Sequence, residues 1–424
     1  NIGKSSIIQS QNSRELGGEI RRSRGEMSSQ WVVRIRACAA GFGAAAAGVW
    51  SCGGSDGTAL AAAAGPRRGL LAVGNAVIDH NVLSTAWDGP AVPVGQFVSS
   101  WSEEERAAAV KAARENPSVE SKVGGSALNA LRVAKNVDVN DEIRVSFVGT
   151  VGKDSSAKLV YKVCAECGVE PLMSLVPELE TGQCAIVIDK LTRDRTIMCI
   201  RGAAGSLDEN KLGEIKMPWQ EDPSADTMVF STAFNYTTPG RRDAVEKVIG
   251  DRVFVGALSS ATLLENFEPV RTHIQKLLPK TSLMFTNGEE LLAYARAMGW
   301  EGGEDAIEQH AQKLAQGMAA PRLVFVTRGA KPTVVSNDKE SVNYKVPVVD
   351  PIKGDTTGAG DSFAGGVLAH ILLHADRSSL IRDAVKGLHP NDKLVASAVA
   401  VGTECATECL DHQGIAGPRK KTNA

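Results

Sequence analysis

A glycine-rich string near the carboxyl end of the chain carries the strongest chemical signal. Residues 354–366 read GDTTGAGDSFAGG and are followed by apolar residues, so the glycines stand just before a helix start. Free backbone N–H groups and the positive end of the helix dipole bind anions there, and small residues let a phosphate approach closely. Asp361 lies in the predicted first turn, where it is either a simple helix starter or a carboxylate beside the anion.

Other nucleotide and metal motifs are not supported. The segment 149–154 lacks the first glycine of a P-loop, because Phe147 stands there, and Asp154 replaces the magnesium-binding Ser or Thr. The dinucleotide fingerprint fails at its sixth position, Phe363. The C-x-x-C string at 164–167 has no second pair at zinc-finger spacing, and the histidines form no H-E-x-x-H or H-x-E motif.

The composition is that of a globular protein without a strong charge bias. The 424 residues allow one large domain or two to three ordinary ones, and 43% are hydrophobic. With 47 basic and 49 acidic residues the formal charge is −2, which gives no sequence-wide case for a nucleic acid or anionic membrane partner. The eight cysteines are dispersed, which favours an intracellular, reduced protein.

Short β-rich runs alternate with helical-period segments from Gly69 onward. This alternation predicts a doubly wound, mostly parallel sheet flanked by helices. We expect buried strands at 70–78, 145–148, 228–231, 253–255, 282–286 and 323–327, and helices at 126–137, 155–167 and 263–278.

A predicted hairpin interrupts this pattern. Residues 182–200 read as two strands around the polar turn 191–194, and with the irregular stretch 83–123 they predict a small β-rich lid over the strand ends. We therefore expect a leader at 1–69, one folded domain at 70–410 with a discontinuous lid (about 83–123 and 170–205), and a tail at 411–424.

The amino-terminal segment leaves three interpretations open. Residues 1–26 are polar and precede Met27, which we expect to be the true start. Residues 27–55 contain arginines, no acidic residue and the apolar run 37–50, which is shorter than the roughly 20 residues that span a membrane. The segment reads as a transit peptide, an inert tail or a secretory signal.

Three motifs in order resemble the ribokinase-like superfamily of sugar and nucleoside kinases, of the phosphofructokinase-B type. They are the string at 354–366, VGGSALN at 123–129, which is similar to the family's Gly-Gly motif, and NGEE at 287–290, which is similar to its Asn-x-x-Glu magnesium motif. The resemblance covers about residues 70–405. It implies a ribokinase-like fold with a lid, ATP as the phosphoryl donor and Mg²⁺ as the cofactor.

The resemblance also implies roles in phosphoryl transfer. Asp361 would accept the proton of the acceptor hydroxyl, while the N–H groups of Gly358, Ala359 and Gly360 would form an anion hole. An aspartate of ordinary pKa, about 3.9, is a weak base, so we expect orientation to matter more than basicity.

Five further residues would serve ATP and its metal. Asn287 and Glu290 would hold the water shell of Mg²⁺, although an Asn cap with a first-turn acid also needs no metal. Thr327 and Gly329 resemble the nucleotide-phosphate turn, the alternative being an ordinary strand end. Arg201 would clamp phosphate when the lid closes, or else is a solvated turn cation.

Within the superfamily the chain resembles the adenosine kinases most closely. GNAVID at 74–79 is similar to their first strand with its substrate-binding Asp, and TGQCA at 181–185 is similar to their lid strand. The chain departs from them at Leu128, where many have Gln, at Ala257, where Asn is usual, and at Thr262, where an aromatic residue is common.

The implied acceptor site contains four residues. Asp79, Gly125 and Asn129 would bind ribose, because a carboxylate and an amide supply the acceptors and donors that a vicinal diol needs. Phe234 aligns with a purine-packing aromatic residue, although a Phe near a buried strand is also an ordinary core residue.

The resemblance implies an ATP-dependent kinase that phosphorylates the 5′-hydroxyl of adenosine, giving AMP and ADP. The alternatives are a kinase for another nucleoside or a free sugar such as ribose or fructose, and a non-catalytic kinase-like subunit. We expect ATP and a small acceptor as partners, no nucleic acid or membrane, and a cytoplasmic or organellar location; the oligomeric state is not predicted.

Overall fold

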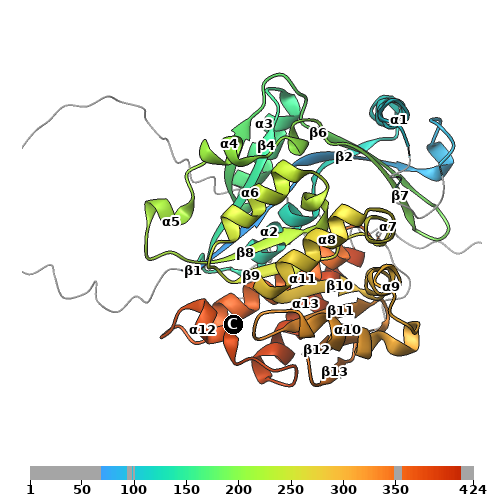
Figure 1. The fold of residues 1–424 in the computed structure, drawn as a ribbon. Helices are drawn as coiled ribbons and strands as arrows, with labels where there is room; N and C mark the ends of the chain where they lie inside the picture. The colour runs from blue at the N-terminus through green and yellow to red at the C-terminus, as the bar shows by residue number, and fades with distance from the viewer. Residues whose placement is uncertain (1–67, 93–97, 99–100, 348–355, 412–424) are drawn as a thin grey trace, which may run out of the picture. The chain divides into compact units, whose positions relative to one another are not determined.

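The structure, a computed structural model, describes residues 68–92, 98, 101–347 and 356–411 (Figure 1). By its internal contacts the chain divides into two units, Asn1–Ala59 and Leu60–Ala424, and the description below concerns the second. The apolar run 37–50 lies outside the described residues, so its three interpretations stay open.

A nine-stranded sheet forms the centre of the fold. Its strands are β1 (Arg68–Val73), β4 (Arg144–Val151), β5 (Glu170–Leu175), β8 (Asp226–Thr232), β9 (Phe254–Ala257), β10 (Thr281–Asn287), β11 (Leu323–Arg328), β12 (Lys331–Ser336) and β13 (Ser341–Tyr344). Their order is β13-β12-β11-β10-β9-β8-β1-β4-β5. Every neighbouring pair is parallel except β11–β12 and β12–β13, which confirms the predicted mostly parallel sheet.

Helices cover both faces of this sheet (Figure 1). The longer ones are α2 (Ser126–Val137), α3 (Ser155–Cys167), α6 (Pro239–Ile249), α8 (Glu268–Leu277), α9 (Gly288–Ala297), α10 (Ile307–Gln316), α11 (Ala359–His374) and α13 (Lys393–Asp411). The shorter ones are α4 (Glu209–Gly213), α5 (Pro218–Glu221), α7 (Ala261–Asn266) and α12 (Ile381–Lys386). Leu70 and Ala72 of β1 point into one apolar layer and Leu71 and Val73 into the other, because side chains alternate along a strand.

Two predicted elements are each divided in the structure. The predicted strand 70–78 is two strands in different sheets: the first ends at Val73 and the second begins at Val77. The predicted helix 263–278 is α7 followed by α8, with a break at Phe267. Pro269 lies in the first turn of α8 and cannot continue a helix from α7.

A separate four-stranded sheet forms the lid. Its order is β3 (Glu120–Gly124), β2 (Val77–Leu83), β6 (Gly182–Ile188) and β7 (Arg195–Ile200), and β6 and β7 are the predicted antiparallel hairpin. The stretch 83–123 is less irregular than expected, because it contains α1 (Glu103–Glu115), which packs on one face of the lid sheet (Figure 1). The lid sheet begins at Val77, before the predicted bound of about 83. Strand β5 lies within the predicted lid segment 170–205 but belongs to the large sheet.

A disulfide between Cys184 and Cys199 joins β6 to β7, so the expectation of a fully reduced chain is wrong for this pair. The two residues are direct partners across the hairpin, a register that composition alone does not show. Across the described ranges, no helix has both the length and the apolar surface needed to cross a membrane.

Candidate active site

A cavity of about 950 Å³, including the open space at its mouth, lies between the lid sheet and the carboxyl ends of strands of the large sheet. From the lid it is lined by Asp79, Ile197 and Cys199, and from the large sheet by Thr232, at the end of β8. Clefts outside the carboxyl ends of parallel strands are the usual ligand sites of such sheets.

Asp361 lies at the amino-terminal turn of α11 and faces this cavity, together with Gly358. Gly358 is the N-cap in a left-handed conformation, φ +82°, which glycine adopts without strain. The first-turn N–H groups of a helix have no partner within the helix, as an anion hole requires. Of the three predicted donors, the N–H of Ala359 also contacts a carbonyl of the preceding turn.

 The Ala359 N–H donates a long hydrogen bond of 3.4 Å to the carbonyl oxygen of Thr356, and Gly360 is exposed.

Asn129, on the first turns of α2, donates a hydrogen bond of 3.1 Å from Nδ2 to Oδ2 of Asp361. Asn129 is buried and also lines the cavity. The structure therefore brings together one residue predicted for the acceptor and the residue predicted as the base.

Burial changes the acid strength of both aspartates. Loss of solvent raises the pKa of Asp361 to about 6, although the hydrogen bond from Asn129 and the charge of Arg195 oppose this shift. Burial raises the pKa of Asp79 to about 7, where Arg195 again opposes the shift and the negative charge of Asp361 adds to it. Asp361 is thus a stronger base than the unperturbed aspartate that the sequence predicted.

Arg195, the first residue of β7, was missed by the sequence analysis. Its side chain lines the cavity, and its Nη1 atom is buried with no hydrogen-bond partner among the residues that the structure describes. Residues 195, 197, 199 and 201 all line the cavity, because alternate residues of a strand share one face. The same alternation, read along the predicted hairpin, could have identified Arg195 beside Arg201.

Two adjacent glycines before α2 shape the acceptor side. A Cβ atom on Gly124 would lie 1.8 Å from Oδ2 of Asp79, so only glycine leaves room for that carboxylate. Gly125, at φ +109°, lines the cavity, and a Cβ atom there would lie 2.1 Å from the carbonyl oxygen of Asn75. Position 125 therefore needs glycine because of its backbone conformation and its close approach to Asn75. Gly124, which the sequence analysis did not select, is the glycine that makes room for Asp79.

Asn287 and Glu290 form a reciprocal helix cap at the start of α9. The Glu290 N–H donates to Oδ1 of Asn287 at 2.8 Å, and the Asn287 N–H donates to Oε2 of Glu290 at 3.1 Å. The helix-start interpretation is therefore correct, and a metal role stays a prediction. Burial raises the pKa of Glu290 to about 7, and the charge of Asp361 contributes to this rise, so the two carboxylates lie within electrostatic reach.

These oxygen donors fit a water-mediated Mg²⁺ ion, which takes few direct protein ligands. Over the described part of the chain, no group of three or more His, Cys, Asp or Glu residues could enclose a metal ion. A site of this kind would therefore depend on water and on the phosphates of a nucleotide for most of its ligands.

Two of the other predicted ATP residues, Thr327 and Gly329, lie next to this cap. Thr327 of β11 is the register partner of Asn287 of β10, so the two strand ends are adjacent. Gly329 has φ +60°, and a Cβ atom there would meet no atom within 4 Å, so the backbone conformation alone favours glycine. Arg201 lies elsewhere, on the wall of the acceptor cavity just after β7.

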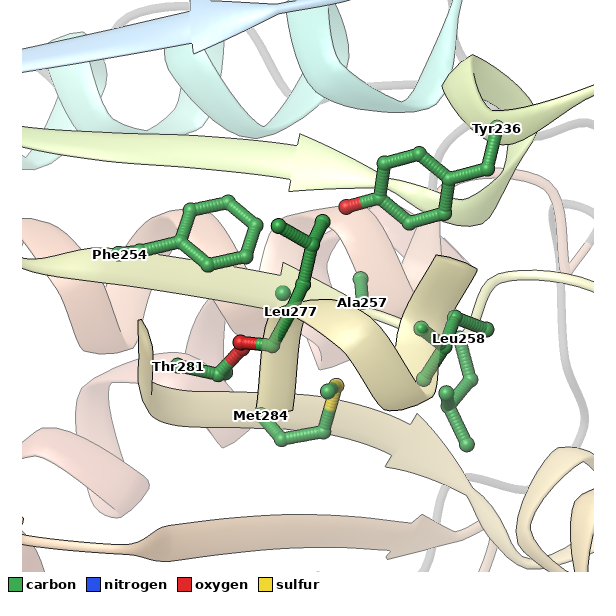
Figure 2. A pocket seen from close by; sticks show the side chains of 9 residues that line it. Tyr236, Phe254, Ala257, Leu258, Leu277, Thr281 and Met284 are labelled. Atoms are coloured by element: carbon green, nitrogen blue, oxygen red, sulfur yellow. The ribbon is translucent and has the colours of Figure 1, made fainter. Parts of the chain in front are cut away.

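Phe234 lies in the short 3₁₀ helix η3 (Ala233–Tyr236) after β8, and its half-buried ring lines the cavity, which favours a ligand contact over a purely core position. The neighbouring Tyr236 belongs to a second, smaller hollow shown in Figure 2. No charged side chain lines this hollow, so it offers no cation to a phosphate.

Of the departures from the adenosine kinases, Leu128 is fully buried and does not line the cavity.

Comparison with known proteins agrees with this geometry. Residues 94–415 match the pfkB family of carbohydrate kinases. Adenosine kinase 1 of Arabidopsis thaliana is 28% identical over 263 residues, which are 60% of this chain and 73% of that protein. The adenosine kinase of Schizosaccharomyces pombe is 27% identical over 266 residues, 60% of this chain and 74% of that protein.

Solved adenosine kinases share the fold. The Anopheles gambiae enzyme in complex with P1,P4-di(adenosine-5) tetraphosphate has a TM-score of 0.65 at 21% identity, covering 81% of this chain and 96% of that one. The Schistosoma mansoni enzyme in complex with 2-fluoroadenosine has a TM-score of 0.64 at 21% identity, covering 82% and 96%. The ribokinase-like fold predicted from the sequence is confirmed.

Proposed function

The chain belongs to the pfkB family of carbohydrate kinases, and on that premise we propose that it transfers the γ-phosphoryl group of ATP to the 5′-hydroxyl of adenosine, giving AMP and ADP. One observation carries the proposal: Asp361 stands at the anion-binding start of α11, faces the acceptor cavity and is hydrogen-bonded to Asn129. The adenosine acceptor is supported by the names of the relatives.

Asp361 accepts the proton of the acceptor hydroxyl. With a pKa of about 6, raised by burial, it is mostly ionised at neutral pH and is a better base than an exposed aspartate. The first-turn N–H groups of Gly358, Ala359 and Gly360 stabilise the negative charge of the transferring phosphoryl group. Most of the catalysis then comes from positioning and charge stabilisation rather than covalent chemistry.

Asn287 and Glu290 hold the water shell of Mg²⁺. When bound, the ion neutralises phosphate charge during the transfer. Thr327 and Gly329, on the adjoining strand end, bind the phosphates of ATP. Of the two lid arginines, Arg195 is the one whose charge acts on Asp361, so it is the better candidate to contact the transferring group; the phosphate role of Arg201 stays a prediction.

Asp79, Gly125 and Asn129 bind the ribose of the acceptor, and Phe234 packs against its base. All four residues line one cavity, in which the negative charge of Asp361 contributes to the raised pKa of Asp79. The two carboxylates therefore face the same acceptor space.

The test is ADP formation by the purified protein with ATP and Mg²⁺, comparing adenosine, inosine, ribose and fructose. Asp361→Asn, which keeps the shape of the side chain, is expected to lower turnover at least about 10²-fold and to leave ATP binding nearly unchanged. Asp251→Asn, at an exposed position, is the matched control.

Each outcome supports adenosine as the acceptor or excludes it. Turnover with adenosine that Asp361→Asn abolishes supports the proposal. Turnover with inosine alone, or only with a free sugar, moves the chain to another nucleoside or sugar acceptor, and ATP binding without turnover of any acceptor indicates a non-catalytic subunit.

A further inference from the structure

Arg241, on the first turns of α6, is one of the largest side chains that the fold buries completely, at 1% exposure. Its neighbour Arg242 is only half-buried. A buried guanidinium is costly because it loses its hydration, and this one gains no carboxylate in return: its three hydrogen-bond acceptors are neutral.

The guanidinium joins three separate segments of the chain. Nη1 donates to the backbone carbonyl of Ala204, in the 3₁₀ helix η2 (Gly202–Gly205) that follows β7. Nη2 donates to the carbonyl oxygen of Gly74 at 3.2 Å and to the side-chain oxygen of Asn235 in η3. No single apolar side chain could make these three contacts, whereas the planar fork of an arginine can.

Each of these three segments supplies a wall residue of the acceptor cavity. Ala204 lines the cavity itself, Asn75 follows Gly74, and Phe234 precedes Asn235. Arg241 therefore stands directly behind the cavity wall without lining it.

The network continues away from the cavity. Asn235 is fully buried, and its Nδ2 donates to the carbonyl of Val73 at 2.7 Å and to Oγ of Ser231 at 2.9 Å. On the other side of η3, Tyr236 enters the apolar hollow of Figure 2 beside Leu258 and Phe254. These contacts hold η3, and with it the Phe234 ring, against the large sheet.

The cost of the arrangement points to a role beyond packing. Burial, with a further contribution from the charge of Arg201, lowers the pKa of Arg241 to about 9, and its Nε atom has no hydrogen-bond partner among the described residues. Well-packed apolar residues in place of buried charges are often neutral or stabilising, so stability alone does not favour an arginine here.

We propose that Arg241 is a positioning residue for the acceptor, which sets the wall formed by Asn75, Ala204 and Phe234 without touching the reacting groups. The inference rests on the proposed function and deepens it. Asn287, Thr327 and Gly329 lie at the ends of β10 and β11, outside this network. Loss of Arg241 should therefore weaken binding of the acceptor and leave binding of ATP unchanged.

The experiment compares steady-state kinetics of the unaltered protein, Arg241→Met and Arg241→Lys, with adenosine varied and then with ATP varied. Arg241→Met is expected to raise the KM for adenosine about 10-fold or more, because small displacements of positioning groups have large effects. The KM for ATP should change by less than about 2-fold. Arg241→Lys keeps the charge and some donors, so it should restore part of the loss.

Two arginines serve as controls. Arg68→Met removes another buried arginine, which donates to the carbonyl oxygens of Leu372 and Ala375 at the far end of α11. It should lower the melting temperature without changing the KM for adenosine selectively. Arg242→Met removes the neighbouring side chain, whose contact is the carbonyl of Pro269 at 3.4 Å, and should change neither KM.

Asn235→Ala keeps the proposal testable if Arg241→Met does not fold, because it removes one acceptor of the guanidinium and should raise the same KM. A folded Arg241→Met or Asn235→Ala protein with an unchanged KM for adenosine, or with both KM values raised equally, overturns the inference. If the unaltered protein uses inosine or ribose instead, the proposed adenosine acceptor fails while the same comparison with that acceptor still decides the role of Arg241.

Discussion

Asn129 donates a hydrogen bond to Asp361 across 232 residues of sequence, and this bond joins the amino-terminal turns of α2 and α11 at one cavity. The amide therefore has two tasks, since it is both a predicted acceptor ligand and the group that orients the proposed base. The bond also stabilises the charged form of Asp361, because it lowers the pKa that burial raises.

This relationship predicts a measurable pH dependence. A base must be deprotonated to act, so kcat/KM should rise with pH through the pKa of Asp361, which burial raises to about 6. Asn129→Leu removes a bond that favours the carboxylate, so the acidic limb should move to higher pH. A limb that moves to lower pH, or stays in place, would contradict this account of Asp361.

Arg195 should both keep the two aspartates ionised and assist phosphoryl transfer. Its positive charge lowers the pKa of Asp79 and of Asp361, so Arg195→Met should shift the acidic limb upward. Loss of a cation that stabilises the transition state should also reduce kcat by about 10²-fold. Arg193→Met, two residues earlier in the turn of the hairpin, is the control, and equal effects of the two substitutions would remove Arg195 from the site.

Gly124→Ala is predicted to disrupt the acceptor site with little change elsewhere. The new methyl group would lie 1.8 Å from Oδ2 of Asp79, so the carboxylate must move out of its place. Turnover should fall about 10²-fold, as expected for a misplaced positioning group. Gly387→Ala, which meets no atom within 4 Å, should leave activity unchanged. Full activity of Gly124→Ala would mean that the position of Asp79 is not critical.

The Cys184–Cys199 disulfide should stabilise the lid. It closes a loop with a sequence separation of 15, for which restriction of the unfolded chain contributes about 3 kcal/mol to stability. Cys184→Ala with Cys199→Ala should lower the melting temperature in non-reducing buffer, and reductant should lower that of the unaltered protein alone. Cys164→Ala, at a free buried cysteine, tests whether any cysteine substitution has this effect. A melting temperature of the unaltered protein that does not respond to reductant would show that the pair is not oxidised in solution.

Several parts of the site were readable from the sequence because their signals are local. The glycines around Asp361 and the Asn287 cap mark helix starts, and such starts depend on backbone groups within one turn. Helices α2 and α3 have the predicted bounds, since their apolar spacing and capping residues lie within the segments themselves. The order of strands and helices likewise predicted the layered α/β fold.

Tertiary structure decided what these local signals do together. Burial raises the pKa values of Asp79 and Asp361, and the charge of Arg195 on the distant hairpin opposes both shifts, so no pattern around either residue contains them. The role of Arg195 depends on which face of the hairpin is turned to the cavity, and that of Arg241 on three backbone segments that meet only in the fold. The sequence by itself determined which helices could bind an anion and where they begin. Only the packed chain determined which side chains share a cavity, because desolvation and Coulomb interactions depend on distances in space rather than along the sequence.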